Sequence, residues 1–323
     1  MKSVLGIWVA SRLGGWSKPE LVLRALFVSG LCLLAIGCGQ EPASLELPAV
    51  APTQLRAPNF SVMSFHLGDR YASAARFPED AALPEPVIRK LAQTAPDLLA
   101  VYGFSEEAGF TTFRSELAEA GLPYPHYAIL ESETSERGLA VLSRHPPMLR
   151  QSHTDDSYRI GDNELRIEPG VLDLTFIIDG RFLLRLYTAD LVEKTFHRLG
   201  QAEMRRNEAR LLAQRVNRAL RDQPDLPILL ACALSDVRDS APFRELTERR
   251  SDLIALDPRD RAGNAWTWRE PEGAAYHAHD FFFVSASLAE RFEPESTLVL
   301  EIPELLAISP HRPILATFRL GPE

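Results

Sequence analysis

Five polar side chains that can do chemistry stand within or beside apolar runs typical of strands: His66, Asp190, Ser235, Asp280 and His311. Two imidazoles and two carboxylates are donors that Zn²⁺ or another transition metal accepts, if a fold brings them into one cleft. A serine hydroxyl with a histidine base would instead make a nucleophile, although the sequence gives no argument for an oxyanion hole. Either chemistry depends on the elements that position these distant residues.

Apolar periodicity predicts a mixture of strands and helices. Alternation or short apolar runs predict strands at 60–67, 98–101, 138–143, 171–178, 182–187, 227–232, 280–284 and 314–318. Helical spacing predicts helices at 86–94, 108–120 and 201–220. Asp179-Gly180 predicts a hairpin. Hairpins mixed with crossovers predict an α/β (α+β) fold, a four-layered sandwich of two mixed β-sheets with helices on the outside.

Short motifs follow one another from about Phe60 to Arg319. They are VMSFHL (62–67), PDLLAVYGF (96–104), GLAVLSR (138–144), YTADL (187–191), ILLACALSD (228–236), WTW (266–268), HDFFFVS (279–285) and SPHRP (309–313). In this order they resemble the motifs of the endonuclease/exonuclease/phosphatase family of metal-dependent phosphoesterases. The resemblance implies a phosphoester hydrolase fold, and it implies Mg²⁺ or Mn²⁺ in active members.

The same resemblance places other side chains where the family has its reactive residues. An opening Asn and a following Glu sit at the family's metal, and these positions are His66 and Gly103 here. The Asp and Asn that orient the nucleophile and contact phosphate correspond to Ala233 and Ser235. The family's phosphate-side His is Asp190, whose carboxylate would repel phosphate. Metal binding with the family geometry is therefore not expected.

One pair of the family's site keeps its residue types. The Asp of the closing motif is Pro310, but Asp280 and His311 are retained. In the family this aspartate hydrogen-bonds the histidine and holds its orientation and charge. The pair is either part of a working site or a hydrogen bond that fastens the last strand at the edge of the core. A rebuilt site that adds His66 and Asp190 could hold a transition metal.

These substitutions favour a pseudoenzyme that acts by binding an unknown protein or a small phosphorylated ligand, with no cofactor. The alternative is a divergent, active phosphodiesterase or phosphatase whose site is rebuilt from His66, Asp190, Asp280 and His311, with Ser235 as a less favoured nucleophile. A purely structural envelope protein without a ligand is the third hypothesis. An open or a filled cleft would distinguish the third from the first two.

The N-terminal segment predicts export. The apolar run at 25–37 follows Lys18 and Arg24. It is shorter than the stretch of about 20 apolar residues that spans a membrane. Residues 1–37 are therefore expected to be a signal peptide.

A lipid anchor is expected directly after that signal. Ala35-Ile36-Gly37-Cys38 resembles the lipobox of bacterial lipoproteins, in which the cysteine carries the lipid. An ordinary signal peptide with an incidental cysteine is the alternative. A Pro/Ala-rich tether at 38–58 would separate Cys38 from a phosphatase-like domain at 59–323. The expected location is the bacterial cell envelope, membrane-anchored and facing the periplasm.

The net charge of the chain limits the classes of partner that it is expected to bind. The formal net charge is −9 and the pI is about 5.5. An acidic surface repels phosphate backbones, so a nucleic-acid partner is not expected. The arginines between 205 and 221 are expected on the solvated outer face of a helix.

Aromatic and imidazole side chains between 266 and 279 have two interpretations. Trp266 and Trp268 could stack a ligand, but tryptophans at this spacing are expected to pack a sheet face. If strand alternation holds, His277 and His279 face away from the side of Asp280, and exposure or a local hydrogen bond is expected for them.

Overall fold

A computed structural model describes residues 59–71, 83–104, 107–131, 137–194, 196–248, 251–270 and 275–321. The expected signal peptide (1–37), Cys38 and the expected tether (38–58) lie outside these residues. Within the described part of the chain, no helix is long and apolar enough to cross a membrane.

The first sheet is centred on β1 (Asn59–Tyr71), with strand order β15-β16-β1-β2-β4-β3. Its other strands are β2 (Leu98–Phe104), β3 (His126–Glu131), β4 (Gly138–Ser143), β15 (Leu298–Val299) and β16 (Ile314–Arg319). Strand β1 runs parallel to β2 and antiparallel to β16. A parallel pair needs a crossover, and α1 (Glu85–Thr94) lies within it. In this register His66 lies beside Tyr102.

The second sheet has the order β11-β14-β10-β9-β8-β5. Its strands are β5 (Pro147–His153), β8 (Val171–Ile178), β9 (Phe182–Asp190), β10 (Ile228–Ala233), β11 (Ile254–Ala255) and β14 (Asp280–Val284). Strand β10 runs parallel to β9 and antiparallel to β14. Two short ladders stand apart from the sheets, β6 (Ser157–Ile160) with β7 (Asn163–Arg166) and β12 (Trp268–Arg269) with β13 (Tyr276–His277).

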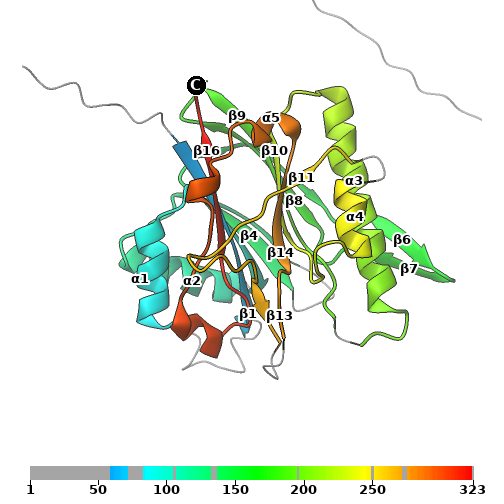
Figure 1. The fold of residues 1–323 in the computed structure, drawn as a ribbon, viewed down its shortest axis with the longest axis horizontal. Helices are drawn as coiled ribbons and strands as arrows, with labels where there is room; N and C mark the ends of the chain where they lie inside the picture. The colour runs from blue at the N-terminus through cyan, green and yellow to red at the C-terminus, as the bar shows by residue number, and fades with distance from the viewer. Residues whose placement is uncertain are drawn as a thin grey trace, which may run out of the picture. The chain divides into compact units, whose positions relative to one another are not determined.

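Helices cover the outer faces of both sheets (Figure 1). Helix α1 and helix α2 (Glu107–Glu119) pack on the first sheet, and α3 (Gln201–Asp222) and α4 (Ala241–Thr247) pack on the second. Short helical turns are α5 (Ala286–Ala289), η1 (Pro294–Ser296) and η2 (Pro303–Ala307). A third buried cluster fills the space between the sheets, with side chains such as Val62, Tyr102, Leu174 and Phe282. The layers are helix, sheet, sheet and helix, which confirms the predicted four-layered α/β sandwich.

Three local expectations about residues on this scaffold are wrong. Arg205 does not lie on a solvated helix face, because its side chain is buried and bonded to Asp236. His279 is also buried, because it lies in the irregular connection between β13 and β14, where strand alternation does not apply. Trp268 does not pack a sheet face. It belongs to the short β12 strand and stacks on the ring of His279.

Candidate functional site

Strand ends from both sheets meet where the site was expected. In the second sheet, Asp190 pairs with Ala233 and Ala233 pairs with Asp280. The two carboxylates therefore stand on either side of β10 at one edge of the sheet, with an alanine between them. The first sheet contributes His66 from β1, and His311 lies just before β16, the neighbour of β1.

Asp280 and His311 form a buried hydrogen-bonded pair. His311 Nδ1 lies 2.9 Å from Asp280 Oδ2, which also accepts a 2.7 Å bond from the Thr267 hydroxyl. Burial raises the pKa of Asp280, but the charge and hydrogen bond of His311 outweigh it and the pKa is lowered. Asp280 is therefore ionised at neutral pH and orients the His311 ring. Asp280 Oδ1 is buried without a partner among the described residues.

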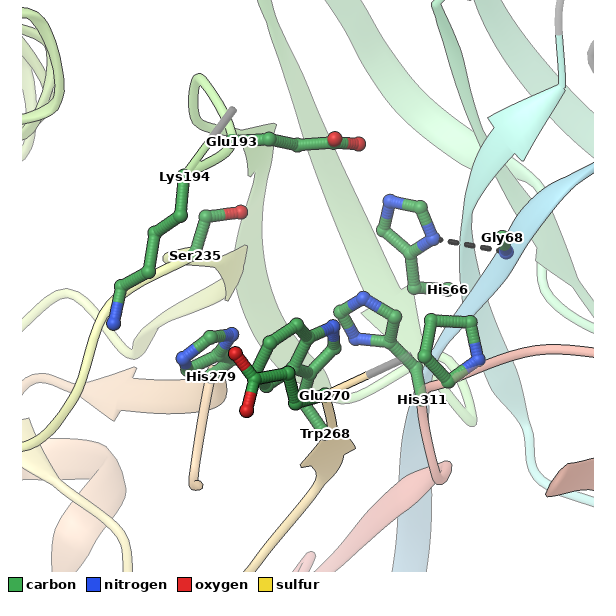
Figure 2. A pocket seen from close by; sticks show the side chains of 10 residues that line it. His66, Gly68, Glu193, Lys194, Ser235, Trp268, Glu270, His279 and His311 are labelled. Atoms are coloured by element: carbon green, nitrogen blue, oxygen red, sulfur yellow. Dashed lines mark hydrogen bonds between the residues drawn. The ribbon is translucent and has the colours of Figure 1, made fainter. Parts of the chain in front are cut away.

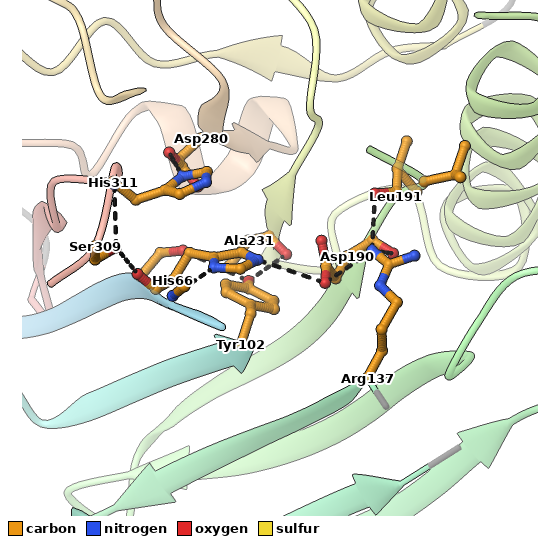
Figure 3. A network of polar contacts seen from close by, with 12 residues as sticks. His66, Tyr102, Arg137, Asp190, Leu191, Ala231, Asp280, Ser309 and His311 are labelled. Carbon is orange, nitrogen blue, oxygen red and sulfur yellow. Dashed lines mark hydrogen bonds and ion pairs between the residues drawn. The ribbon is translucent and has the colours of Figure 1, made fainter. Parts of the chain in front are cut away.

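Asp190 is the centre of a second buried group. Its Oδ2 lies 2.8 Å from Arg137 Nη2 and 3.7 Å from His66 Nε2 (Figure 3). Arg137 also donates to the backbone carbonyls of Asp190 and Leu191, at 3.2 and 2.9 Å. Burial raises the pKa of Asp190, but the Arg137 charge outweighs it and holds that pKa at about 2. A carboxylate that is ionised and already paired with a guanidinium is a poor partner for phosphate.

His66 is held on both sides of its ring. Its Nδ1 accepts a 3.0 Å hydrogen bond from the Gly68 backbone N–H, so the neutral ring carries its proton on Nε2, toward Asp190. Burial lowers the pKa of His66, but Asp190, with the charges of Asp280 and Glu193, raises it above its ordinary value. The Gly68 amide opposes this rise, because Nδ1 must lose that bond to take a second proton.

The two imidazoles stack on one another. The rings of His66 and His311 have centroids 4.3 Å apart and are tilted by 15°. Ser309 joins their backbones, since its Oγ donates to the His66 carbonyl at 2.9 Å and accepts from the His311 N–H at 3.1 Å. The loop before β16 is thereby fixed against β1, and the two carboxylate–imidazole pairs form one connected group.

The two imidazoles of this group form one wall of an open cavity of about 410 Å³ (Figure 2). The lining residues are His66, Gly68, Glu193, Lys194, Ser235, Trp268, Glu270, His279, Pro310 and His311. The ring of His279 stacks on Trp268, with centroids 4.4 Å apart and an angle of 18°. Burial lowers the pKa of His279 to about 3, so this ring is neutral at physiological pH. A filled cleft lined by apolar side chains would favour a purely structural protein, and this cavity is open and lined largely by polar side chains.

The opposite wall is positioned by buried polar residues behind it. Arg205 donates to the backbone carbonyls of Val192 and Glu193, at 3.3 and 2.9 Å, and Glu208 accepts the Val192 N–H at 2.9 Å. Burial raises the pKa of Glu208 above its ordinary value. These bonds fix the segment after β9, which carries Glu193 and Lys194 to the cavity.

Comparisons with known proteins give a fold and little else. No family model matches the sequence. A curated relative, the DNA mismatch repair protein MutL of Herminiimonas arsenicoxydans, is 29% identical over 118 residues, which are 36% of this chain and 19% of that protein. The chain therefore spans about a fifth of the length of that relative.

Solved structures resemble nearly the whole described domain. The human Nocturnin catalytic domain with bound sulfate has a TM-score of 0.55 at 15% identity, covering 81% of this chain and 95% of its own. An endonuclease/exonuclease/phosphatase family protein from Bacteroides thetaiotaomicron has a TM-score of 0.56 at 15% identity, covering 81% and 96%. The chain has the endonuclease/exonuclease/phosphatase fold. At these identities the likeness establishes the fold alone, and the chemistry depends on the residues present.

The residues at the strand ends do not fit the metal that the endonuclease/exonuclease/phosphatase fold implies. Gly103, where the resemblance places a Glu ligand, has a φ of +82°, and a Cβ there would lie 2.5 Å from the Gly68 carbonyl oxygen and 2.9 Å from His66 Cε1. The His66 ring therefore occupies the space next to Gly103 that a side chain would need. Within the described ranges, no group of three or more His, Cys, Asp or Glu side chains is arranged to hold a metal ion.

Ser235 lies in the wall of the cavity but lacks a base. It follows β10 with a φ of 54°, in the left-handed region, which turns the chain toward Asp236. No hydrogen bond joins its hydroxyl to His311 or to another described residue. A nucleophilic Ser235–His311 pair is not formed in this structure.

Sequence reasoning missed four residues of the site. Arg137, Glu193, Lys194 and Glu270 contact Asp190 or line the cavity, yet none was singled out. They lie in connections between elements, where no periodicity marks them. Arg137 stands directly before the GLAVLSR motif at the start of β4, and this position is the one signal that could have identified it.

Proposed function

We propose that this protein uses the endonuclease/exonuclease/phosphatase fold to bind a small ligand in the cavity at the strand ends, without metal-dependent phosphoester hydrolysis. The observation that carries the proposal is the packing of His66 on Gly103. A carboxylate at position 103 and the imidazole of His66 cannot occupy the same space, because a Cβ at 103 would lie 2.9 Å from His66 Cε1.

The other donors support the same proposal, because each side chain already has a partner in the protein, through one oxygen in the case of Asp190 and Asp280. Asp190 pairs with Arg137 at 2.8 Å, and His66 Nδ1 accepts the Gly68 amide at 3.0 Å. Asp280 Oδ2 is shared by Thr267 and His311. Mg²⁺ usually binds one or two carboxylates together with several waters. Both carboxylates of this group are buried and already paired, Asp190 with Arg137 and Asp280 with His311.

We also propose that the domain works at the cell envelope, anchored through lipid on Cys38 with residues 38–58 as a spacer. The lipobox-like sequence before Cys38 and the Pro/Ala-rich composition after it support this. Labelling cells with a radioactive fatty acid would test it: the full chain should incorporate the label and the Cys38→Ala variant should not. A labelled Cys38→Ala variant would contradict the lipid anchor.

A phosphodiesterase assay with bis(p-nitrophenyl) phosphate and Mg²⁺ or Mn²⁺ tests the absence of metal-dependent hydrolysis. We expect no turnover above the buffer rate in the parent chain. The His311→Ala variant is the diagnostic, and His197→Ala, on an exposed residue before α3 and outside the cavity lining, is its matched control. Metal-dependent turnover that His311→Ala abolishes and His197→Ala retains would overturn the proposal.

A second candidate function is a metal-independent acid–base reaction at His311. The observation in its favour is that Asp280 binds Nδ1 of this ring, whereas Nε2 has no partner among the described residues and His311 lines the cavity. That arrangement leaves Nε2 to give or take a proton from a bound molecule. His66, Asp190, Asp280 and His311 would then form the rebuilt site.

The two candidate functions predict different rates of diester hydrolysis when EDTA removes divalent metal ions. The acid–base candidate predicts hydrolysis of the same diester in excess EDTA, lost in His311→Ala and reduced in Asp280→Asn. Unchanged turnover in both variants, or no turnover in the parent chain, would exclude it.

A further inference from the structure

Carboxylates outnumber cations around the cavity. Glu193 and Glu270 line it, and neither has a lysine or arginine partner among the described residues. Asp280, behind His311, is paired with an imidazole and a hydroxyl. The cavity therefore presents negative charge to whatever enters it.

Three described cations near the cavity are already paired with carboxylates. Lys194 lies 3.4 Å from Asp236, and the buried Arg205 lies 3.2 Å from the same carboxylate. Arg137 is paired with Asp190 at 2.8 Å. A phosphate group would meet carboxylates, and the described lining includes no guanidinium to balance them, which costs binding energy in a partly buried site.

One wall of the cavity is a pair of neutral aromatic rings. Trp268 stacks on His279, and the lowered pKa of His279, about 3, keeps positive charge away from this wall. The face of an indole attracts a cation that comes within about 6 Å of its centroid. Glu270, two residues beyond Trp268, also lines the cavity and would supply a formal countercharge.

His279 gives an independent indication of a missing partner. Its side chain is only 3% exposed, it lines the cavity, and its Nε2 has no hydrogen-bond partner among the described residues. Buried polar atoms are nearly always bonded, so an unbonded imidazole nitrogen in a cavity wall marks a place where a polar ligand group is expected.

We infer that the cavity takes a small organic cation, a molecule with an ammonium group that packs against Trp268 between Glu193 and Glu270. This rests on the proposed binding function of the same cavity, and it names the ligand class. It departs from the phosphorylated ligand that the resemblance to phosphoesterases suggested.

Isothermal titration calorimetry on the full chain at low ionic strength tests the charge preference directly. The probes are tetramethylammonium chloride and sodium phosphate, each titrated at pH 7.5. Tetramethylammonium is expected to bind with a Kd of about 1–10 mM, as a small ion with one charge and few contacts can. Phosphate is expected to show no saturable heat over the same range.

Charge-neutralising variants locate the site. Glu270→Gln and Glu193→Gln are each expected to raise the Kd for tetramethylammonium by about threefold to tenfold, since each removes one countercharge. Trp268→Leu should raise it by a similar factor, and Trp268→Phe, which keeps an aromatic face, should raise it less. Glu119→Gln, on the exposed surface of α2, is the matched control and should leave the Kd unchanged.

The outcomes separate this inference from the function on which it rests. The first outcome is saturable phosphate binding that Lys194→Gln weakens, with no binding of tetramethylammonium. This result overturns the cation preference but leaves the binding function in place. Tetramethylammonium binding that no variant of Glu193, Glu270 or Trp268 weakens overturns the location. Metal-dependent diester turnover overturns the binding function itself, whatever the cation titration shows.

Discussion

Two groups of Asp, His and Arg lie around strands β8 and β9, and they differ in how completely the carboxylate is bonded. Asp173, on β8, accepts two bonds from Arg185, at 2.9 and 2.7 Å, and one from His153 at 3.0 Å. Both of its oxygens are used, although it stands on the outer face of the sheet. It is only 1% exposed.

Asp190, at the end of β9, has the same residue types around it but fewer bonds. Its Oδ2 is paired with Arg137 Nη2 at 2.8 Å. The distance from Oδ2 to His66 Nε2 is 3.7 Å, which is beyond hydrogen-bond length. Its Oδ1 is buried without a partner among the described residues. The same three residue types thus give a closed structural network on one face and an open group at the cavity wall.

The difference teaches that residue type does not separate a structural ion pair from a candidate site. A fully bonded carboxylate offers nothing to a ligand. An underbonded one next to a cavity retains unused bonding capacity, and buried groups of that kind are rare in folded proteins. We therefore expect the closed group to contribute more to the stability of the fold than the open group does.

The largest expected effect is at the closed group. Asp173→Ala leaves the partly buried Arg185 and His153 without their carboxylate, and removal of one partner from a buried ion pair costs about 3–5 kcal/mol. Urea unfolding followed by circular dichroism measures this loss. Asp155→Ala, whose exposed pair with Arg166 is worth little, is the control. A loss below about 1 kcal/mol would show that the network is not structural.

The second effect belongs to His279, the other underbonded group of the cavity. Its folded pKa of about 3 lies below the ordinary histidine value, so the unfolded chain binds a proton first as the pH falls. Stability should therefore decline from about pH 6.5 toward pH 3, by about 4 kcal/mol from this residue. His279→Phe should remove that part of the slope in Tm against pH. Parallel curves for the parent and variant would contradict the assignment.

The contribution of Asp190 to the free energy of unfolding should be smaller than that of His279, and it should be lost at lower pH. Its folded pKa of about 2 is below the ordinary aspartate value, so its stabilisation is present above about pH 4 and is lost as the pH falls toward 2. About two pKa units correspond to about 2–3 kcal/mol. Asp190→Asn should lose about this much at pH 7 and should lack this part of the decline between pH 4 and pH 2. A variant as stable as the parent at pH 7 would mean that the Arg137 pair contributes nothing.

The elements of the fold could be predicted because apolar periodicity is local. The apolar runs of β4, β8 and β14 and the helical spacing of α3 identify those elements without any tertiary contact. Strands β5 to β7 were missed, because their residues are mostly exposed and carry no apolar period. The loss of a carboxylate at Gly103 was also visible in the sequence.

The contacts of the site could not be predicted, because they depend on connections whose course only the fold determines. Helical spacing places Arg205 on a solvated face. Its partner Asp236 lies in the loop after β10, and no pattern along the helix indicates that contact. His279 was assigned by alternation to the wrong environment, because the chain is irregular between β13 and β14. The His66 ring fills the space beside Gly103, and only the geometry of the adjacent strands β1 and β2 shows this.

The smallest effect sharpens the comparison most. His153→Gln removes one of three bonds to Asp173 and leaves both bonds of Arg185, on a side chain that is 19% exposed. We expect a loss of about 1 kcal/mol in urea unfolding, the value of one hydrogen bond when the buried carboxylate keeps other partners. A loss of 3 kcal/mol or more would mean that the network fails as a unit when any bond is lost. The number of bonds to a carboxylate would then be a poor guide to its role. The missing partner of Asp190 Oδ1 would no longer distinguish the open group from the closed one.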